Sequence, residues 1–268
     1  MSTTANLGLQ KQKQIHHKTI KIFGPPGTGK TWTLIERVVK RYLKQGVDPE
    51  KIAFISFTNK AVDTAKVRAL EAFPHLDSKS FSRFRTLHSY CRRYFEEEIF
   101  DTKDCMIDYA LTNNFVKRSD NRLSQDNFTY SDWSLGIYDK SRNLLEDPVL
   151  VYKRESQKKD NLDVYTRKIS TYEHYKTSGG ERSFLDFTDM IERALHEVEF
   201  PQLDVLILDE AQDFTPLQWS LIYKMSDNVK RIYLAGDDDQ AIYQWNGADT
   251  KYFTKFFPGR KVVLRKTR

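Results

Sequence analysis

Apolar positions along the chain alternate between short runs typical of strands and longer helical spacings. Residues 19–23 form a short, mostly apolar run before a turn rich in glycine and proline. A helical spacing follows, with apolar residues at Leu34, Ile35, Val38, Val39 and Leu43. The near-continuous apolar run of 52–57 predicts a strand that is buried on both faces. A second helix is expected over 60–73, because Pro74 stops the pattern.

The same alternation resumes in the last third of the chain. The predicted elements are a helix near 186–198, a strand over 205–208, a helix near 216–225 and strands over 231–234 and 261–264. Strands that alternate with helices indicate an α/β fold with a parallel sheet covered by helices. Between them the chain is charged, rich in tyrosine and poor in strand patterns, so we expect a mainly helical insertion there. The expected division is therefore a first part of the α/β domain over 1–90, an insertion over 91–182 and a second part over 183–268.

Length, charge and cysteine content narrow the class of protein. The chain has 268 residues, enough for one large or two smaller domains, and a net charge of +6, which favours an anionic partner such as nucleic acid. Its two cysteines, Cys91 and Cys105, form no CxxC pair, which argues against a disulfide framework or a zinc site and fits a reducing cytosol. No apolar run of about 18 residues exists, so we expect no membrane partner and a cytoplasmic or nucleoid-associated location.

A phosphate-binding pattern, G-x-x-x-x-G-K-[ST], lies between the first predicted strand and the first predicted helix. Its residues are Gly24, Pro25, Pro26, Gly27, Thr28, Gly29, Lys30 and Thr31. Glycines allow successive N–H groups to point at phosphate oxygens, and the N-terminus of the following helix attracts the same anion. Lys30 can reach the β- and γ-phosphates of ATP, and the Thr31 hydroxyl can ligate Mg²⁺. The alternative interpretation is a glycine turn without a ligand.

A second candidate group ends the predicted strand over 205–208. Asp209 and Glu210 follow it directly, and ligands in open α/β sheets bind at the carboxyl ends of strands. We expect Asp209 to hold Mg²⁺, directly or through water, and Glu210 to act as the general base that polarises the attacking water. The alternative is an acidic cluster that caps a helix N-terminus.

Further motifs follow in a fixed order along the chain. They are Phe57-Thr58-Asn59-Lys60-Ala61, Thr86-Leu87-His88-Ser89, Asp186-Phe187, Asp209-Glu210-Ala211-Gln212-Asp213 and the segment 235–245. In this order the set resembles the UvrD/Rep branch of superfamily 1 DNA helicases. The resemblance implies a RecA-like P-loop NTPase domain that hydrolyses Mg-ATP, binds single-stranded DNA and moves 3′→5′.

The resemblance also implies individual roles. Gln240 would contact the γ-phosphate or the attacking water and complete the catalytic set of Lys30, Asp209 and Glu210. The implied DNA contacts are Thr58, Asn59, Lys60, His88, Tyr243 and Trp245, with Trp245 stacking on a base. Alternatives remain open: Trp245 as a core residue, the segment after Phe57 as a capped helix start, and His88 without a function.

Two departures from the family pattern affect these expectations. Asn246-Gly247 stands where the family has Arg-Gly, and Gln10, Gln12 and Gln14 do not match the spacing of the glutamine that reads adenine. The last strand leads toward an arginine that contacts the γ-phosphate in the family, and Arg268 is the candidate.

The second RecA-like domain of the family does not follow in this chain, and a second chain that supplies it is a further expected partner. We therefore expect weak Mg-ATP binding, slow hydrolysis and no unwinding by the chain alone. The competing interpretations are a truncated or split helicase half that binds DNA or a partner without productive hydrolysis, and a P-loop regulator that is not a helicase.

Overall fold

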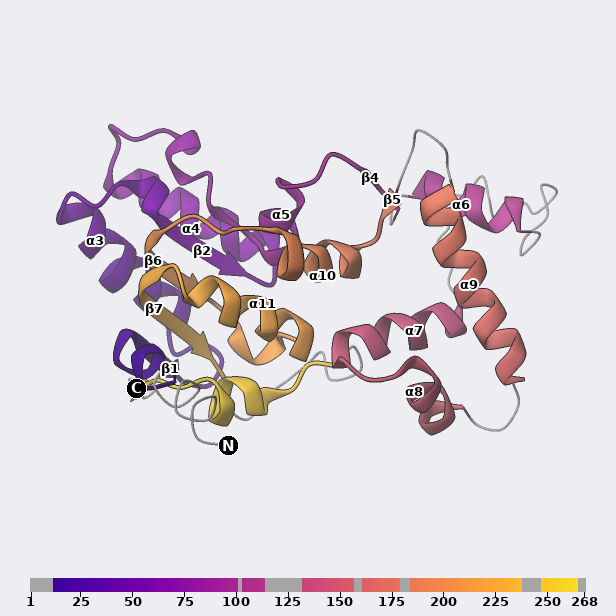
Figure 1. Ribbon diagram of the computed structural model, residues 1–268. Helices are drawn as coiled ribbons and strands as arrows, with labels where there is room; N and C mark the ends of the chain where they lie inside the picture. The colour runs from indigo at the N-terminus through magenta and orange to yellow at the C-terminus, as the bar shows by residue number, and fades with distance from the viewer. Residues whose placement is uncertain are drawn as a thin grey trace. The chain divides into compact units, whose positions relative to one another are not determined.

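A computed structural model describes residues 12–100, 103–113, 132–156, 161–178, 184–237 and 247–264. The chain divides into two compact units. Figure 1 colours the ribbon by residue number, from indigo at the N-terminus to yellow at the C-terminus. Unit 1 joins Met1–Tyr90 with Glu197–Arg268, and unit 2 contains Cys91–His196. The described part of the chain has no helix that is both long enough and apolar enough to span a membrane, and Cys91 and Cys105 are both free thiols.

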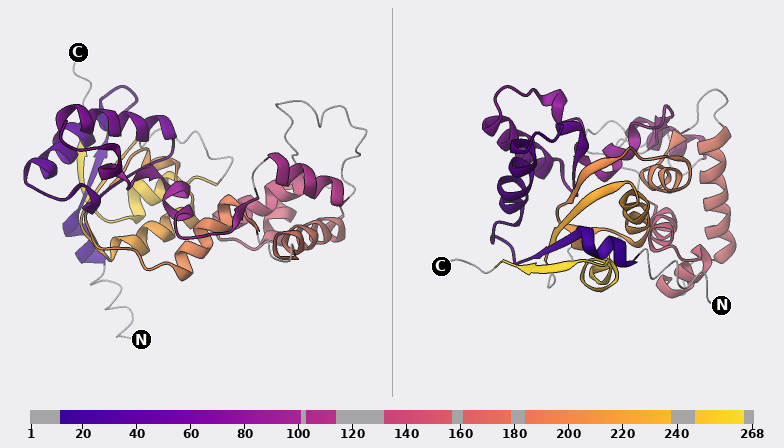
Figure 2. Two further views of the ribbon diagram at one scale, coloured as in Figure 1. Left: turned by 90° about the horizontal axis from the view of Figure 1, so that it is seen from above. Right: turned by 60° about the vertical axis from the view of Figure 1, so that its left-hand side comes forward.

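Unit 1 is built on a six-stranded parallel sheet in the order β3-β2-β6-β7-β1-β8. Its strands are β1 (Thr19–Phe23), β2 (Ile52–Ser56), β3 (Phe84–Thr86), β6 (Leu203–Leu208), β7 (Val229–Gly236) and β8 (Arg260–Val263). The right-hand view of Figure 2 shows the C-terminal strand β8, in yellow, beside the N-terminal strand β1, in indigo. The α/β fold with a parallel sheet that the sequence predicts is confirmed. The strand β3 has no counterpart among the predicted elements, because three residues carry too little pattern to distinguish a strand.

Helices connect these strands. In unit 1 they are α2 (Lys30–Thr33), η1 (Leu34–Val39), α3 (Lys40–Lys44), η2 (Pro49–Lys51), α4 (Asn59–Ala72), η3 (Ser78–Phe81), η5 (Ala211–Asp213), α11 (Pro216–Ser226) and η7 (Tyr252–Phe256), and α5 (Leu87–Arg92) crosses into unit 2. The first three follow one another directly, so the predicted first helix is present with a π-helical middle. Thr58 caps α4 by accepting a hydrogen bond from the N–H of Ala61, which is the capped helix start that the sequence left open.

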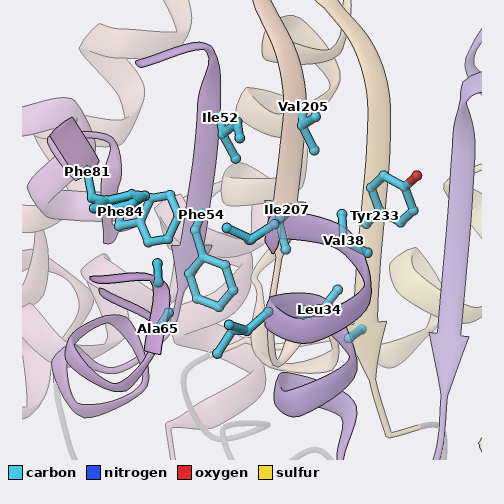
Figure 3. Close-up of a cluster of buried hydrophobic side chains, with 14 of the residues drawn as sticks. Leu34, Val38, Ile52, Phe54, Ala65, Phe81, Phe84, Val205, Ile207 and Tyr233 are labelled. Atoms are coloured by element: carbon cyan, nitrogen blue, oxygen red, sulfur yellow. The ribbon is translucent and has the colours of Figure 1, made fainter. Parts of the chain in front are cut away.

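One face of the sheet buries a continuous apolar core. Figure 3 shows Leu34 and Val38 of η1 against Phe54, Ile207 and neighbouring strand residues. Successive side chains of a strand point to opposite faces, so alternate residues of β6 reach this core. The opposite face is buried as well, since Phe23 stacks on Phe253 of η7 at 4.6 Å between ring centroids. Burial on both faces explains why the strands read as continuous apolar runs.

Lys21 is a charged residue inside this second face. Its side chain is buried, and its Nζ donates hydrogen bonds to the carbonyl oxygens of Phe257 at 2.8 Å and Thr254 at 3.3 Å. Burial, together with the charge of Lys261, lowers the pKa of Lys21 to about 8. The lysine thus satisfies carbonyls at the C-terminal end of η7 and joins that helix to β1.

Unit 2 is mainly helical. It contains α6 (Lys103–Thr112), α7 (Trp133–Leu144), α8 (Pro148–Glu155), α9 (Leu162–Ser178), most of α10 (Phe187–Glu197) and the short parallel pair β4 (Glu98–Ile99) and β5 (Phe184–Leu185). The predicted insertion, 91–182, begins with this unit but ends before it. The sequence predicts that the helix near 186–198 belongs to the second part of the α/β domain, whereas the residues of α10 up to His196 group with the helical unit.

Buried charges explain this grouping. Arg142 of α7 forms ion pairs with Asp186, Asp189 and Glu192, which lie just before or within α10. Lys176 of α9, whose side chain is 2% exposed, pairs with Asp186 and Asp189 as well. Hydrogen-bonded charges that are removed from water hold their helices together, because separating them would leave charges unpaired in the interior.

Candidate functional site

The phosphate-binding pattern forms the loop between β1 and α2. Gly27 and Gly29 both have φ of +79°, a left-handed conformation that side-chain-bearing residues seldom adopt. A Cβ atom on Gly24 would lie 2.5 Å from the Thr28 hydroxyl oxygen, so this position is closed to larger residues too. The loop is anchored to the sheet because the Gly24 N–H donates to the carbonyl of Gly236 in β7. Thr28 donates its hydroxyl hydrogen to the Pro25 carbonyl at 2.7 Å, which tightens the turn.

Lys30 opens α2 and is 7% exposed. Its Nζ donates hydrogen bonds to the carbonyl oxygens of Gly24 at 2.7 Å and Pro25 at 3.4 Å. The ammonium group is therefore held against the loop itself. A positive charge and a helix N-terminus at one place form a site suited to an anion.

Thr31 and Asp209 are brought into direct contact although they are 178 positions apart. The Thr31 hydroxyl donates to Asp209 Oδ2 at 2.6 Å. Asp209 is fully buried at the end of β6, and its N–H donates to the carbonyl of Ile55 in the neighbouring strand β2. Burial raises the pKa of the Asp209 carboxyl to about 6, against the lowering effect of the Thr31 hydrogen bond. A hydroxyl and a carboxylate in contact are two oxygen ligands of the kind that Mg²⁺ prefers, so these residues fit that ion.

The raised pKa gives a testable stability effect. A rise from 3.8 to about 6 corresponds to roughly 3 kcal/mol between the two protonation states. Between pH 3.8 and about 6, the Asp209 carboxyl is protonated in the folded protein but ionised in the unfolded chain. The free energy of unfolding therefore falls as the pH rises from 3.8 to about 6. Asp209→Asn is expected to remove this dependence and to stabilise the metal-free protein by about 1–3 kcal/mol near neutral pH.

Urea unfolding with a chelator, at about pH 5 and about pH 7.5, measures this effect. Asp63→Asn, on the exposed surface of α4, removes the same charge without the burial and serves as the control. An equal response to pH in Asp209→Asn and the unchanged protein would contradict the assignment.

Glu210 follows Asp209 in a strained backbone conformation. Its φ is +53°, in the left-handed region, where residues with a Cβ are held at a cost of order 1–2 kcal/mol. The turn brings the Glu210 side chain to the wall of a cavity of about 650 Å³. Gln212 donates from Nε2 to Glu210 Oε2 at 3.0 Å. A half-buried carboxylate beside a phosphate-binding loop is suited to accept a proton from water.

The cavity collects residues from four strand ends. Its walls are formed by Pro26, Gly27, Gly29, Lys30, Thr31, Trp32, Phe57, Thr58, Lys60, Ala61, Thr64, Arg68, Glu210, Gln212, Asp213 and Asp237. Asp237 follows β7, which pairs with β6, so the strand that leads toward Gln240 is the neighbour of the acidic strand. The end of β7 therefore lies at the site, in addition to the strand ends that carry the phosphate loop and the acidic motif.

The predicted site residues are distributed in three groups. The cavity wall contains Pro26, Gly27, Gly29, Lys30, Thr31, Thr58, Lys60 and Glu210. Asp209 contacts Thr31, and Gly24, Pro25 and Thr28 belong to the phosphate loop but not to the wall. Asn59 is exposed at the start of α4 and His88 lies in α5, and neither belongs to the cavity wall. The others, Gln240, Tyr243, Trp245 and Arg268, lie outside the described residues.

Several wall residues were not among the predicted site residues. Trp32, which directly follows the phosphate-binding pattern, is 47% exposed and belongs to the cavity wall. Thr64 and Arg68 follow Lys60 at intervals of four, the helical spacing that places three side chains on one face, so this signal was available in the sequence. Gln212 and Asp237 stood within motifs but had no assigned role.

A known protein family and several known proteins match this chain over most of its length. The family model for the UvrD/REP helicase N-terminal domain matches residues 7–258. The chain is 28% identical over 257 residues to the ATP-dependent DNA helicase PcrA of Bacillus subtilis, covering 89% of this chain and 34% of that protein. It is 26% identical over 266 residues to the ATP-dependent DNA helicase Rep of Buchnera aphidicola, covering 90% and 39%. A probable DNA helicase II homolog of Mycoplasma pneumoniae is 24% identical over 244 residues, covering 85% and 34%. The chain thus spans between 34% and 39% of the length of these relatives.

Proposed function

Since the chain belongs to the UvrD/REP helicase N-terminal domain family, we propose that it is the ATP-binding half of a DNA helicase motor. In this proposal it binds Mg-ATP, hydrolyses it and couples hydrolysis to binding of single-stranded DNA and to movement in the 3′→5′ direction. The observation that carries the proposal is the contact between Thr31 and Asp209 beside the phosphate loop. It joins the two motifs that a P-loop ATPase needs at one place.

The triphosphate is bound by the loop and by Lys30. Backbone N–H groups of residues 26–30 and the N-terminus of the helix face the phosphate oxygens. Lys30 exchanges the carbonyl oxygens of Gly24 and Pro25 for oxygens of the β- and γ-phosphates. The exchange keeps the ammonium group hydrogen-bonded in both states, which limits its desolvation cost.

Thr31 and Asp209 are the residues that would hold Mg²⁺. When bound, the ion would neutralise charge on the phosphate oxygens. Glu210 accepts a proton from the attacking water, and Gln240 senses the γ-phosphate. Arg268 is proposed as a second contact to that phosphate. Trp32, which is 47% exposed and belongs to the cavity wall, is proposed as the contact to the adenine base.

The proposed DNA contacts are those of the family resemblance: Thr58, Asn59, Lys60, His88, Tyr243 and Trp245. Two observations support the proposed contacts of Thr58, Asn59 and Lys60. Thr58, Asn59 and Lys60 are exposed, and Lys60 carries a positive charge at the start of α4. Exposed N–H groups and a lysine suit the sugar-phosphate backbone, which is recognised without regard to sequence.

The segment 1–268 by itself is expected to hydrolyse ATP slowly and to leave duplex DNA intact, because a motor of this kind needs a second domain that closes on the nucleotide. Steady-state ATP hydrolysis with and without single-stranded DNA tests this, with Lys30→Ala reporting any background turnover. Fast, DNA-stimulated turnover by the isolated chain would contradict the expectation. DNA binding with no Lys30-dependent hydrolysis would favour the competing function, a binding module without productive chemistry.

A further inference from the structure

The side-chain amide of Gln212 makes three hydrogen bonds, one through its oxygen and two through its nitrogen. The residue is 5% exposed, and it lies in η5, two positions after Glu210. Its Oε1 accepts from the N–H of Asp237 at 3.0 Å. Its Nε2 donates to Glu210 Oε2 at 3.0 Å and to Asp213 Oδ2 at 3.2 Å. One buried amide therefore connects two carboxylates to the end of β7.

The orientation of this amide follows from its partners. A backbone N–H can only donate, so the oxygen of Gln212 must face Asp237. Carboxylates can only accept when ionised, so the nitrogen must face Glu210 and Asp213. The opposite orientation would place like groups together at all three contacts. The three hydrogen-bond partners thus determine which end of the Gln212 amide is oxygen and which is nitrogen.

The end of β7 is shaped to receive this side chain. A Cβ atom on Gly236 would lie 2.7 Å from Gln212 Oε1 and 2.8 Å from the ring of Phe253. Only glycine leaves the amide oxygen room beside the strand. The close approach of Gln212 to the end of β7 therefore depends on glycine at position 236 as well as on Gln212 itself.

We infer that Gln212 is a positioning residue, which sets the direction of the Glu210 carboxylate for hydrolysis. The inference rests on the proposed function, in which Glu210 is the general base. A glutamate side chain has several rotatable bonds, and the left-handed backbone of Glu210 does not by itself fix its carboxylate. The Gln212 amide occupies Oε2 and leaves Oε1 for the attacking water. Because the other end of the amide is held by Asp237, the direction of the base is linked to the end of β7.

Two substitutions separate this role from a structural one. Gln212→Met keeps the length of the side chain and removes all three hydrogen bonds. Gln212→Glu keeps the acceptor for the Asp237 N–H but cannot donate to Glu210 when ionised. Both variants are expected to hydrolyse ATP about 10–100-fold more slowly, as for other residues that orient a reactive group, with the Kd for Mg-ATP within about threefold.

The experiment is single-turnover hydrolysis with the whole chain in excess over radiolabelled ATP, together with equilibrium nucleotide binding and thermal melting. If Gln212→Met melts before the assay temperature, Gln212→Glu decides the result. A merely structural role would weaken nucleotide binding and hydrolysis together. Hydrolysis within about twofold of the unchanged chain in a folded variant would overturn the inference.

A double substitution provides the sharper readout. In a Glu210→Gln background no base remains to be oriented, so adding Gln212→Met is expected to slow hydrolysis by less than about twofold further. A full additional loss in that background would overturn the inference and leave the proposed function standing. Absence of any Lys30-dependent hydrolysis in the unchanged chain would overturn both.

Discussion

Replacing Glu210 by glutamine is expected to slow ATP hydrolysis by a factor on the order of 10²–10⁴, the usual contribution of a general base. Glutamine has the shape of glutamate but cannot take the proton of the attacking water. It adopts the left-handed φ of +53° at the same cost as glutamate, so the turn after Asp209 should persist. In the proposed function the loop and Lys30 bind the phosphates, and this substitution leaves both unchanged. Affinity for Mg-ATP should therefore stay within about threefold.

Single-turnover hydrolysis and equilibrium binding of ATP measure the two quantities separately. Asp63→Asn is the matched control, since it also converts a carboxylate to an amide and lies on α4, which contributes Lys60 to the cavity wall. Its hydrolysis rate is expected to equal that of the unchanged chain. If Glu210→Gln retains the full rate, the general base is another group, and Asp213 and Asp237 are the other carboxylates on the wall.

Replacing Arg142 by alanine is expected to lower the free energy of unfolding of unit 2 by about 3–5 kcal/mol, the usual effect of breaking a buried ion pair. The guanidinium is 8% exposed and donates to Asp186 at 2.9 Å and to Glu192 at 2.7 Å. Although burial opposes ionisation, Arg142 and Lys176 hold the pKa of Asp186 well below its usual value. The stabilisation from this carboxylate is therefore fully present above its ordinary pKa of 3.8 and is lost as the pH falls further.

Hydrogen exchange of α7 and α10 under native conditions measures the stability of this unit directly, without assuming that the whole chain unfolds in one step. Arg154→Ala is the control, because Arg154 is 51% exposed and pairs with Glu146 at the surface. A surface pair of this kind contributes only about 0–1 kcal/mol. Arg142→Lys should fall between the two, because lysine keeps the charge but lacks the fork that reaches three carboxylates. Equal protection in Arg142→Ala and Arg154→Ala would show that the network does not stabilise unit 2.

The elements that the sequence predicted correctly depend on local patterns. The strand over 19–23 matches β1, and the helix over 216–225 differs from α11 by one residue at its end. Thr215 and Gln218 form a capping box around Pro216, so the start of α11 is encoded within four residues. The phosphate loop is encoded locally as well, because Gly27 and Gly29 supply the left-handed backbone that it needs.

Features that depend on distant partners could not be predicted in this way. The strand β3 exists because Phe84 and its two successors pair with β2, and its own three residues have no distinct pattern. The grouping of α10 with unit 2 depends on Arg142 and Lys176, which lie on two other helices.

The same distinction applies to the site. The amino-acid sequence by itself determined the phosphate loop, the acidic strand end and the alternation of strands with helices, because each is a matter of neighbouring residues and their preferred backbone conformations. Only the tertiary structure decided that β6 lies between β2 and β7, that Thr31 touches Asp209, and that the amide of Gln212 reaches both Glu210 and the end of β7. Apart from the contact of Gln212 with Glu210, which are two positions apart, those contacts join residues far apart in the chain, and they depend on which strands lie side by side in the sheet.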